Sequence, residues 1–200
     1  IDVDHWRPGL DPCHRSSLAP GGEKIVMHIS NFRPVKRVED VVQIFARISK
    51  KVDARLVFVG DGPERPRAAV LAEELGIRNR VLFLGKHASV EELLACADLF
   101  LLPSETESFG LAALEAMACG APVIASHTGG LPEVVEHGVS GYLFPPGSVE
   151  EMADAGIEIL SDPERRRAFS EAGRRVAVER FSASSVVPMY ERVYERVTAR

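Results

Sequence analysis

Short apolar runs, separated by segments with helical spacing, dominate this chain and limit the folds it can adopt. Six of the runs predict strands, at residues 24–29, 55–59, 81–84, 98–102, 122–125 and 141–144. Apolar residues at helical spacing predict helices at 37–50, 64–75, 90–96, 130–137, 148–160, 164–179 and 184–198, with one more that starts near residue 111. The strands are continuously apolar, which is typical of a parallel sheet covered on both faces. The sequence therefore predicts an α/β fold, a doubly wound parallel sheet of about six strands with helices on both faces.

The carboxyl ends of these strands are the expected ligand-binding edge, because open α/β sheets bind ligands in the crevice beyond them. The loops at those ends are residues 30–36, 60–63, 85–88, 103–110 and 126–130. The first loop holds Ser30, Asn31, Arg33 and Lys36, just before a predicted helix. Cations beside a helix N-terminus can hold a diphosphate. Solvated surface cations are the alternative, but the position of this loop at the binding edge favours a functional role.

Two carboxylates, Glu107 and Glu115, are separated by eight positions in the fourth of these loops and the helix after it. Eight residues is a little over two helical turns, so side chains at this spacing share roughly one helix face. The small and apolar residues from Leu111 onward predict that this helix is buried. A carboxylate on a buried helix requires a partner, because an unpaired buried charge is costly. The segment therefore predicts a site for a phosphorylated, hydroxyl-rich ligand, with helix amides on the phosphate and carboxylates on the hydroxyls.

Glycines in the other loops leave alternatives open. Gly60 begins a Gly-Asp-Gly-Pro segment, which is either a tight turn or a close approach of backbone to a ligand. It is not the dinucleotide fingerprint, because an arginine stands where the third glycine is expected, and the P-loop pattern is absent. Gly85 and Lys86 follow the third strand, where backbone groups could contact a base. Gly129 and Gly130 are either a small-residue wall of a pocket or a turn.

Composition excludes several classes of protein. The net charge of −5 does not favour nucleic acid, and the apolar runs are too short to span a bilayer. The cysteines, Cys13, Cys96 and Cys119, are widely spaced and form no C-x-x-C pair, so we expect neither a zinc site nor a disulfide framework. With no signal-peptide pattern at the start, these features predict a cytoplasmic protein. Because the first residue is isoleucine, we expect the chain to begin within a longer protein.

The segment from Glu107 to Glu115 reads E-x-F-G-x-x-x-x-E, and further motifs follow at 115–125, 129–135 and 138–145. Together they resemble the C-terminal, donor-binding domain of the retaining GT-B glycosyltransferases of family 4, and the resemblance covers essentially the whole chain. It implies a Rossmann-like fold, the C-terminal half of a GT-B enzyme, and transfer of a sugar from a nucleotide sugar to a hydroxyl acceptor. Residues 28–40 are similar to the branch of that family that transfers N-acetylglucosamine from UDP-GlcNAc to L-malate in bacillithiol biosynthesis.

The resemblance implies roles for individual residues. Glu107 is expected to contact the sugar hydroxyls and stabilise charge near the reacting centre, and Lys36 to neutralise the diphosphate leaving group. Glu115 is expected to accept hydrogen bonds from the ribose hydroxyls. The family often has an arginine where this chain has Asn31, and Arg33 is expected to supply that cation instead. The catalytic set is thus Glu107, Lys36 and Arg33, and the donor-binding set is Ser30, Asn31, Gly60, Gly85, Lys86, Ser108, Phe109, Gly110, Leu111 and Glu115.

The resemblance also implies a domain organisation. Residues 1–23 would lead in from a missing N-terminal acceptor domain, residues 24–180 would bind the nucleotide sugar, and the helix in 181–200 would pack back toward the missing domain. A UDP-sugar and a small hydroxyl acceptor are the expected partners; no metal or other cofactor is required, and homo-oligomers are left open. The isolated domain is expected to transfer little sugar. The alternatives are an enzyme with a polysaccharide or lipid-linked acceptor, a GT-B-like UDP-sugar epimerase, and a non-catalytic nucleotide-sugar-binding domain.

Overall fold

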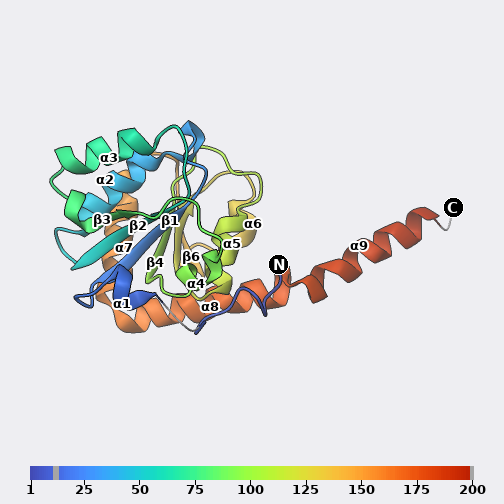
Figure 1. The fold of residues 1–200 in the computed structure, drawn as a ribbon. Helices are drawn as coiled ribbons and strands as arrows, with labels where there is room; N and C mark the ends of the chain where they lie inside the picture. Colours follow the sequence, from blue (N-terminus) through green and yellow to red (C-terminus); the bar gives the residue numbers. More distant parts are fainter. Residues whose placement is uncertain (11–13, 199–200) are drawn as a thin grey trace.

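The computed structural model describes residues 1–10 and 14–198, and it contains one parallel sheet with helices on both faces (Figure 1). The strands are β1 (Lys24–Ile29), β2 (Ala54–Val59), β3 (Val81–Phe83), β4 (Leu99–Leu102), β5 (Val123–Ser126) and β6 (Gly141–Phe144). The helices are α1 (Arg15–Leu18), α2 (Val38–Ile48), α3 (Arg65–Glu74), α4 (Val90–Leu94), α5 (Leu111–Ala118), α6 (Leu131–Val134), α7 (Val149–Ser161), α8 (Pro163–Phe181) and α9 (Ala183–Thr198), with short 3-10 helices η1 (Pro34–Lys36) and η2 (Arg78–Arg80). All six predicted strands are confirmed, with ends that differ by no more than one residue.

The order of the strands in the sheet is β3-β2-β1-β4-β5-β6, and every neighbouring pair is parallel. The chain winds outward from β1 to β3, then crosses back to β4 and winds the other way. In open α/β sheets, such a reversal is the point where ligands bind, beyond the carboxyl ends of the strands, here those of β1 and β4. The loops that follow Ile29 and Leu102 therefore flank the expected binding point.

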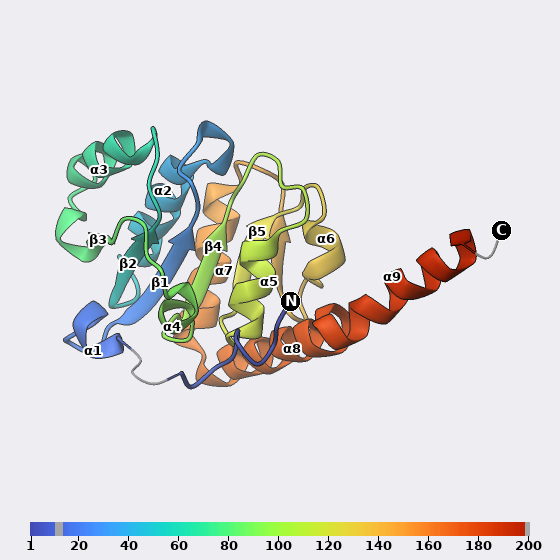
Figure 2. The same ribbon diagram turned by 45° about the vertical axis from the view of Figure 1, so that its right-hand side comes forward.

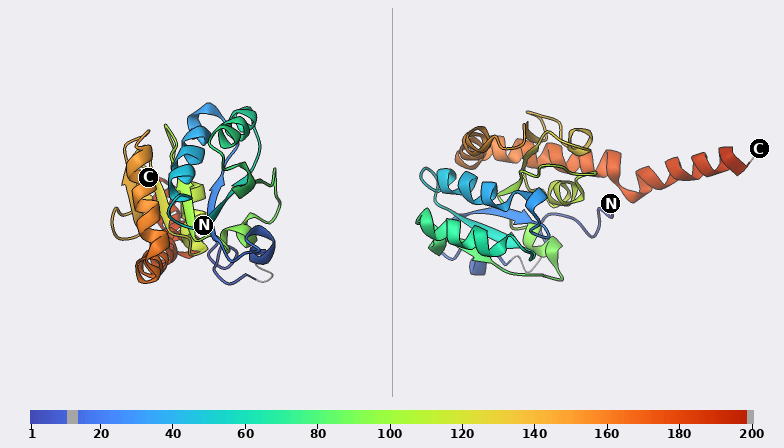
Figure 3. Two further views of the ribbon diagram at one scale, coloured as in Figure 1. Left: turned by 90° about the vertical axis from the view of Figure 1, so that its left-hand side faces the viewer. Right: turned by 90° about the horizontal axis from the view of Figure 1, so that it is seen from above.

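Successive residues of each strand contribute to two separate cores. In β1, Ile25 and Met27 pack with residues of α4, α5 and α8, whereas Val26 packs with residues of α2, α3 and α7. All three side chains are fully buried. Figure 3 shows helices on both sides of the sheet. Because neighbouring side chains of a strand point to opposite faces, both must be apolar, which explains the continuous apolar runs of the sequence.

The helices agree less closely with the sequence prediction than the strands do. Helix α1 was not predicted, because four residues are too few to show helical periodicity. Helices α4 and α6 are shorter than the predicted segments at 90–96 and 130–137. The predicted apolar face of α2 is confirmed, since its five members are all buried: Val38, Val41, Val42, Phe45 and Ile48.

The start of the chain runs along α8 and reaches the base of α9. The amino group of Ile1 donates to the carbonyl of Phe181 at 2.7 Å, and the N–H of Ala183 donates to the carbonyl of Ile1 at 2.8 Å. Arg174 of α8 donates to the carbonyl of Trp6 at 2.6 Å. Helix α9 then projects from the body of the molecule (Figures 1 and 2). Its exposed apolar residues are Val187, Met189, Tyr190, Val193, Tyr194 and Val197.

The described residues can also be compared with the sequence-based expectations about membrane spans, metal sites and disulfides. Within residues 1–10 and 14–198, no helix is both long and apolar enough to cross a bilayer, and no group of three His, Cys, Asp or Glu side chains is placed to hold a metal ion. Cys119 is a buried free thiol. Cys96 is disulfide-bonded, although the cysteine spacing indicated no disulfide framework. Cys13 lies outside the described residues.

Candidate active site

Two oppositely charged side chains meet where the strand order reverses. Lys36 lies in the segment after β1, and Glu107 lies in the loop after β4. The Nζ of Lys36 donates to the Oε2 of Glu107 at 2.7 Å, and the two side chains are only 19% and 16% exposed. The pairing depends on β1 and β4 being neighbours in the sheet, because the two residues are far apart in the sequence. The structure thus brings together two of the three residues that were predicted to be catalytic.

A second ion pair joins the same two loops. Arg37 donates through Nη1 to Glu105 and through Nε to Asp40, both at 2.7 Å. The hydrogen bond to Asp40, and then that to Glu105, raises the pKa of the Arg37 guanidinium. The N–H of Glu105 also donates to the carbonyl of Val35 at 2.8 Å. This ion-pair clamp was not predicted from the sequence, in which the available signal was a cation and an acid in two loops at the same edge of the sheet.

Two glycines hold the backbone of the Glu107 loop in place. A Cβ at Gly129 would lie 1.6 Å from the carbonyl oxygen of Glu107, and a Cβ at Gly130 would lie 2.8 Å from the Cα of Phe109. The N–H of Gly130 donates to the carbonyl of Glu107 at 3.2 Å. Only glycine permits backbones to approach so closely. Of the two alternatives for Gly129 and Gly130, the turn is confirmed, and this turn packs directly against the Glu107 loop.

The loop after β1 is supported in the same way from β2. A Cβ at Gly60 would lie 1.9 Å from the carbonyl oxygen of Ser30, and a Cβ at Gly62 would lie 2.0 Å from that of Asn31. The N–H of Gly60 donates to the carbonyl of Gly85 at 2.7 Å, which joins the loops after β2 and β3. Gly60 therefore serves close packing between loops, and the loops after three neighbouring strands form one rigid rim.

The N-terminus of α5 lies beside Glu107, since a Cβ at Gly110 would be 3.9 Å from Cγ of Glu107. Gly110 precedes the helix with a φ of 93°, a conformation that favours glycine. The first N–H groups of an α-helix have no partner within the helix and carry a partial positive charge. Because Gly110 follows Glu107 by three residues, these amides lie beside the Lys36–Glu107 pair. Phe109 packs edge-on against Phe181 with ring centroids 5.7 Å apart, and Leu111 is exposed. The helix start can therefore hold an anion.

Glu115 lies in the body of α5, and among the described residues its carboxylate makes no hydrogen bond or ion pair. Burial raises the pKa of Glu115 above its ordinary value, and the nearby His5 opposes that shift. The sequence predicted that this carboxylate needs a partner, and none of the residues that the structure describes supplies one. A carboxylate has acceptor capacity for several donors, so ligand hydroxyls could fill this role.

The other predicted residues lie at the same edge of the sheet with fewer contacts. Asn31, Arg33 and Lys86 are exposed, and within the described part of the chain their side chains make no hydrogen bond or ion pair. Ser108 is exposed as well. The structure therefore does not bring Arg33 into contact with the Lys36–Glu107 pair.

His28 is a buried polar residue whose role was not predicted from the sequence. It lies in β1, with Nδ1 2.9 Å from the carbonyl oxygen of Leu101 and Nε2 2.8 Å from Oγ of Ser30. Burial lowers the pKa of His28 to about 4, so the ring is neutral near pH 7. The available signal was a histidine within an otherwise apolar strand.

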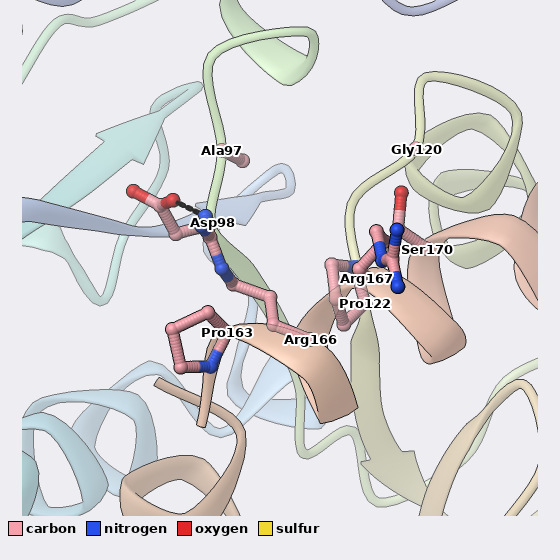
Figure 4. Close-up of a pocket in the computed structure, with 8 residues that line it drawn as sticks. All are labelled: Ala97, Asp98, Gly120, Pro122, Pro163, Arg166, Arg167 and Ser170. Atoms are coloured by element: carbon pink, nitrogen blue, oxygen red, sulfur yellow. Dashed lines mark hydrogen bonds and ion pairs between the residues drawn. The ribbon is translucent and has the colours of Figure 1, made fainter. Parts of the chain in front are cut away.

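A cavity of about 220 Å³ lies at the opposite edge of the sheet, beside the amino ends of β4 and β5 (Figure 4). Asp98 lines it and is only 3% exposed. This carboxylate accepts hydrogen bonds from Arg166, from Arg15 at 2.6 Å and from the N–H of Ile25 at 2.9 Å. Because Asp98 is paired with both arginines, the cavity borders a structural ion-pair network.

A family model and curated proteins of known name both match this chain. A family model described as "Glycosyl transferases group 1" matches residues 12–176. The chain is 53% identical over 172 residues to N-acetyl-alpha-D-glucosaminyl L-malate synthase of Bacillus anthracis, a match that covers 86% of this chain and 45% of that protein. The chain spans about half the length of the curated relatives it matches.

Solved structures share the fold. Sucrose-phosphate synthase from Thermosynechococcus elongatus superposes with a TM-score of 0.89 at 30% identity, over 100% of this chain and 51% of that one. Anabaena Alr3699/HepE in complex with UDP and glucose superposes with a TM-score of 0.85 at 29% identity, over 100% of this chain and 55% of that one. The predicted α/β fold, the C-terminal half of a GT-B enzyme, is thereby confirmed.

Proposed function

The chain belongs to the glycosyl transferases group 1 family, and on that basis we propose that the loops beyond the carboxyl ends of β1 and β4 bind the nucleotide-sugar donor of a retaining glycosyltransferase. The observation that carries the proposal is the Lys36–Glu107 ion pair beside the N-terminus of α5. It combines a cation, a carboxylate and free amides at one point of the sheet edge. A nucleotide sugar presents the complementary groups, a diphosphate next to sugar hydroxyls.

The diphosphate half of the site consists of Lys36 and the first amides of α5. As the bond between sugar and phosphate breaks, negative charge develops on the leaving diphosphate. An ammonium and a helix N-terminus, both fixed before the reaction, stabilise this charge without reorganisation. Arg33 is exposed in the same loop, and we assign it a supporting role that begins when the ligand is bound.

The carboxylates take the hydroxyl groups of the donor. Glu107 accepts from the sugar hydroxyls and stabilises the positive charge that develops at the anomeric carbon. Glu115 accepts from the ribose hydroxyls, which supply the partners that its half-buried carboxylate lacks. The backbone at Gly85 and Lys86 faces the base. Holding these groups does not require a metal, so we propose a metal-independent transfer.

The identity of the donor and acceptor is proposed from the relatives. The Bacillus anthracis relative is named as an N-acetyl-alpha-D-glucosaminyl L-malate synthase, and the Anabaena structure holds UDP. We therefore assign UDP-N-acetylglucosamine as donor and L-malate as acceptor, with the bacillithiol route as the setting and the cytoplasm as the compartment.

The acceptor is held by a further domain in this proposal. The relatives are about twice as long as the chain, and the backbone of Ile1 is bonded at the base of α9. In this proposal a longer chain enters at the base of α9, a helix whose exposed apolar side chains include Tyr190 and Val193. We assign residues 1–23 as the lead-in from that domain, 24–180 as the donor domain, and the helix within 181–200 as its contact with the acceptor domain.

Calorimetric titration of the chain with UDP, UDP-N-acetylglucosamine and ADP tests the donor site. Glu115→Ala should weaken UDP binding about 10- to 100-fold, because it removes charge-assisted hydrogen bonds. Glu179→Ala is the matched control, since Glu179 is exposed on α8 and belongs to none of the loops at the carboxyl ends of the strands, and it should bind as the wild type does.

Equal affinity for ADP and UDP, or an unaffected Glu115→Ala variant, would contradict the assignment of the site. An assay of the full-length protein separates the remaining alternatives. Malate-dependent release of UDP supports the synthase, while formation of an epimerised UDP-sugar without acceptor would show an epimerase. Malate-dependent transfer by residues 1–200 alone would contradict the assignment of the acceptor to another domain.

A further inference from the structure

A chain of hydrogen bonds crosses from β4 to the loop after β1 through a buried histidine. Nδ1 of His28 lies 2.9 Å from the carbonyl oxygen of Leu101, and Nε2 lies 2.8 Å from Oγ of Ser30. A carbonyl can only accept, so Nδ1 carries the proton, and in a neutral ring Nε2 accepts from the Ser30 hydroxyl. Oγ of Ser30 in turn accepts from the N–H of Phe32 at 3.1 Å. Each donor in this chain therefore has an acceptor.

The chain ends on a residue with an unfavourable backbone. Phe32 has a φ of 41°, in the left-handed region that side chains other than glycine rarely adopt. Its ring is fully buried against Phe58, with centroids 5.4 Å apart, and its carbonyl accepts from the N–H of Glu64 at 3.0 Å. Such strain persists only where the surroundings impose it. The bond from Phe32 to Ser30, held in turn by His28, is one of these restraints.

We propose that His28 is a positioning residue for the donor site, because it joins Leu101 to Ser30 and thereby fixes the loop that presents Lys36. The inference rests on the proposed function, which gives this loop a diphosphate to hold. His28 itself is fully buried and acts through Ser30 without touching the ligand. His28 also lies in β1, where the strand order reverses. It therefore ties the position of the Lys36 loop to β4, the strand that leads to Glu107.

The surroundings of His28 keep the ring neutral. The rings of Phe32 and Phe58 lie 6.1 and 5.7 Å from it. Among the described residues, Lys36, which is paired with Glu107, is the charged group that acts on the ring. Burial is the main reason that the pKa of His28 falls to about 4, and the charge of Lys36 lowers it further. Protonation would turn Nε2 into a donor and remove the acceptor of the Ser30 hydroxyl.

Two amide variants separate the two ends of the hydrogen-bond chain. The amide of glutamine reaches the position of Nε2 and can accept from Ser30, whereas that of asparagine reaches only the position of Nδ1. Calorimetric UDP titration would compare His28→Gln, His28→Asn, Ser30→Ala and the double variant His28→Asn/Ser30→Ala, with urea unfolding to verify that each is folded. We expect His28→Asn to weaken UDP binding about tenfold and the double variant to bind no more weakly than Ser30→Ala. His28→Gln keeps the acceptor for Ser30 but loses the donor to Leu101, so its affinity should fall between those of His28→Asn and the wild type, with a loss of about threefold.

A folded His28→Asn variant that binds UDP as the wild type does would overturn the inference. It would also be overturned if the losses of binding free energy in His28→Asn and Ser30→Ala were additive in the double variant. Imidazole ¹⁵N NMR gives a readout without ligand, and it should show a neutral ring protonated at Nδ1 down to about pH 5. A ring protonated at Nε2 would also overturn the inference. If the wild type itself binds no nucleotide, the proposed function fails, and with it the donor role of His28. That outcome differs from a loss of UDP binding that is confined to the variants.

Discussion

Replacement of Gly129 by alanine tests whether the backbone contact behind Glu107 sets the geometry of the site. The added Cβ would lie 1.6 Å from the carbonyl oxygen of Glu107, whereas ordinary contacts begin at 3.4 Å. One of the two loops must therefore shift by well over an ångström, and the hydrogen bond from Gly130 to Glu107 is strained or lost. Misplacement by about 1 Å can lower catalysis by about 100-fold, so we expect a loss of similar size in sugar transfer by the full-length protein.

Gly138→Ala provides the matched control. Gly138 has a φ of +78° and Gly129 a φ of +53°, but a Cβ at Gly138 meets nothing within 4 Å. Both variants require an alanine in the left-handed region, which costs about 1–2 kcal/mol. Overpacking adds about 1–3 kcal/mol at Gly129 alone. Urea denaturation should therefore show a loss of roughly 2–5 kcal/mol for Gly129→Ala and about 1–2 kcal/mol for Gly138→Ala.

Ligand titration completes this test. Because Glu107 is assigned to the sugar, Gly129→Ala should weaken binding of UDP-N-acetylglucosamine more than binding of UDP, while Gly138→Ala should change neither. If the two variants have equal free energies of unfolding and equal affinities, the contact between Gly129 and the Glu107 carbonyl has no consequence, and the reasoning is refuted.

Two further predictions concern stability. The pKa of His28 falls from 6.5 to about 4 in the folded state, so between these values the unfolded chain binds more protons. The free energy of unfolding that this shift contributes is fully present above pH 6.5 and should fall by roughly 3 kcal/mol as the pH drops to 4. The midpoints of urea unfolding, measured against pH for the wild type and for His28→Gln, should show this loss in the wild type alone. A difference between the two proteins that does not depend on pH would contradict the prediction. Asp98→Ala should lower the free energy of unfolding by about 3 kcal/mol, as measured by urea denaturation. This is the low end of the range for a broken buried ion pair, because Arg15 and Arg166 can reach solvent. UDP affinity should not change, since Asp98 lies at the opposite edge, and weaker binding by the folded variant would contradict that placement.

The strands could be predicted because each one faces two cores. A strand such as β1, buried on both sides, needs apolar residues at every position, and that pattern is visible without coordinates. The edge at which Lys36 and Glu107 lie could be predicted for the same reason, because both follow strand ends. Their 2.7 Å contact could not, because it depends on β1 and β4 being neighbours, and strand order is not encoded in any local pattern.

The support of the site was harder to predict than its charged residues. The close contacts of Gly60 and Gly129 are made with backbone from other loops, so the sequence could show only that glycines were present. The Arg37–Glu105 clamp uses residue types that are ordinarily solvated. His28 and its bond to Leu101 depend on a neighbouring strand. In each case the partner lies in a different loop or strand, and composition near the residue carries no information about it.

The free protein already satisfies the charges that the donor would engage. Lys36 and Glu107 neutralise each other at 2.7 Å in a largely buried position, where leaving either one unpaired would be costly. A diphosphate alone offers a partner to Lys36 but leaves Glu107 without one, whereas an intact nucleotide sugar offers phosphate to the first and hydroxyl donors to the second. The exchange of partners is therefore balanced only for the complete donor. The Arg37–Glu105 pair and the glycine contacts join the same loops independently of that exchange, so the loops need not separate when the Lys36–Glu107 pair opens.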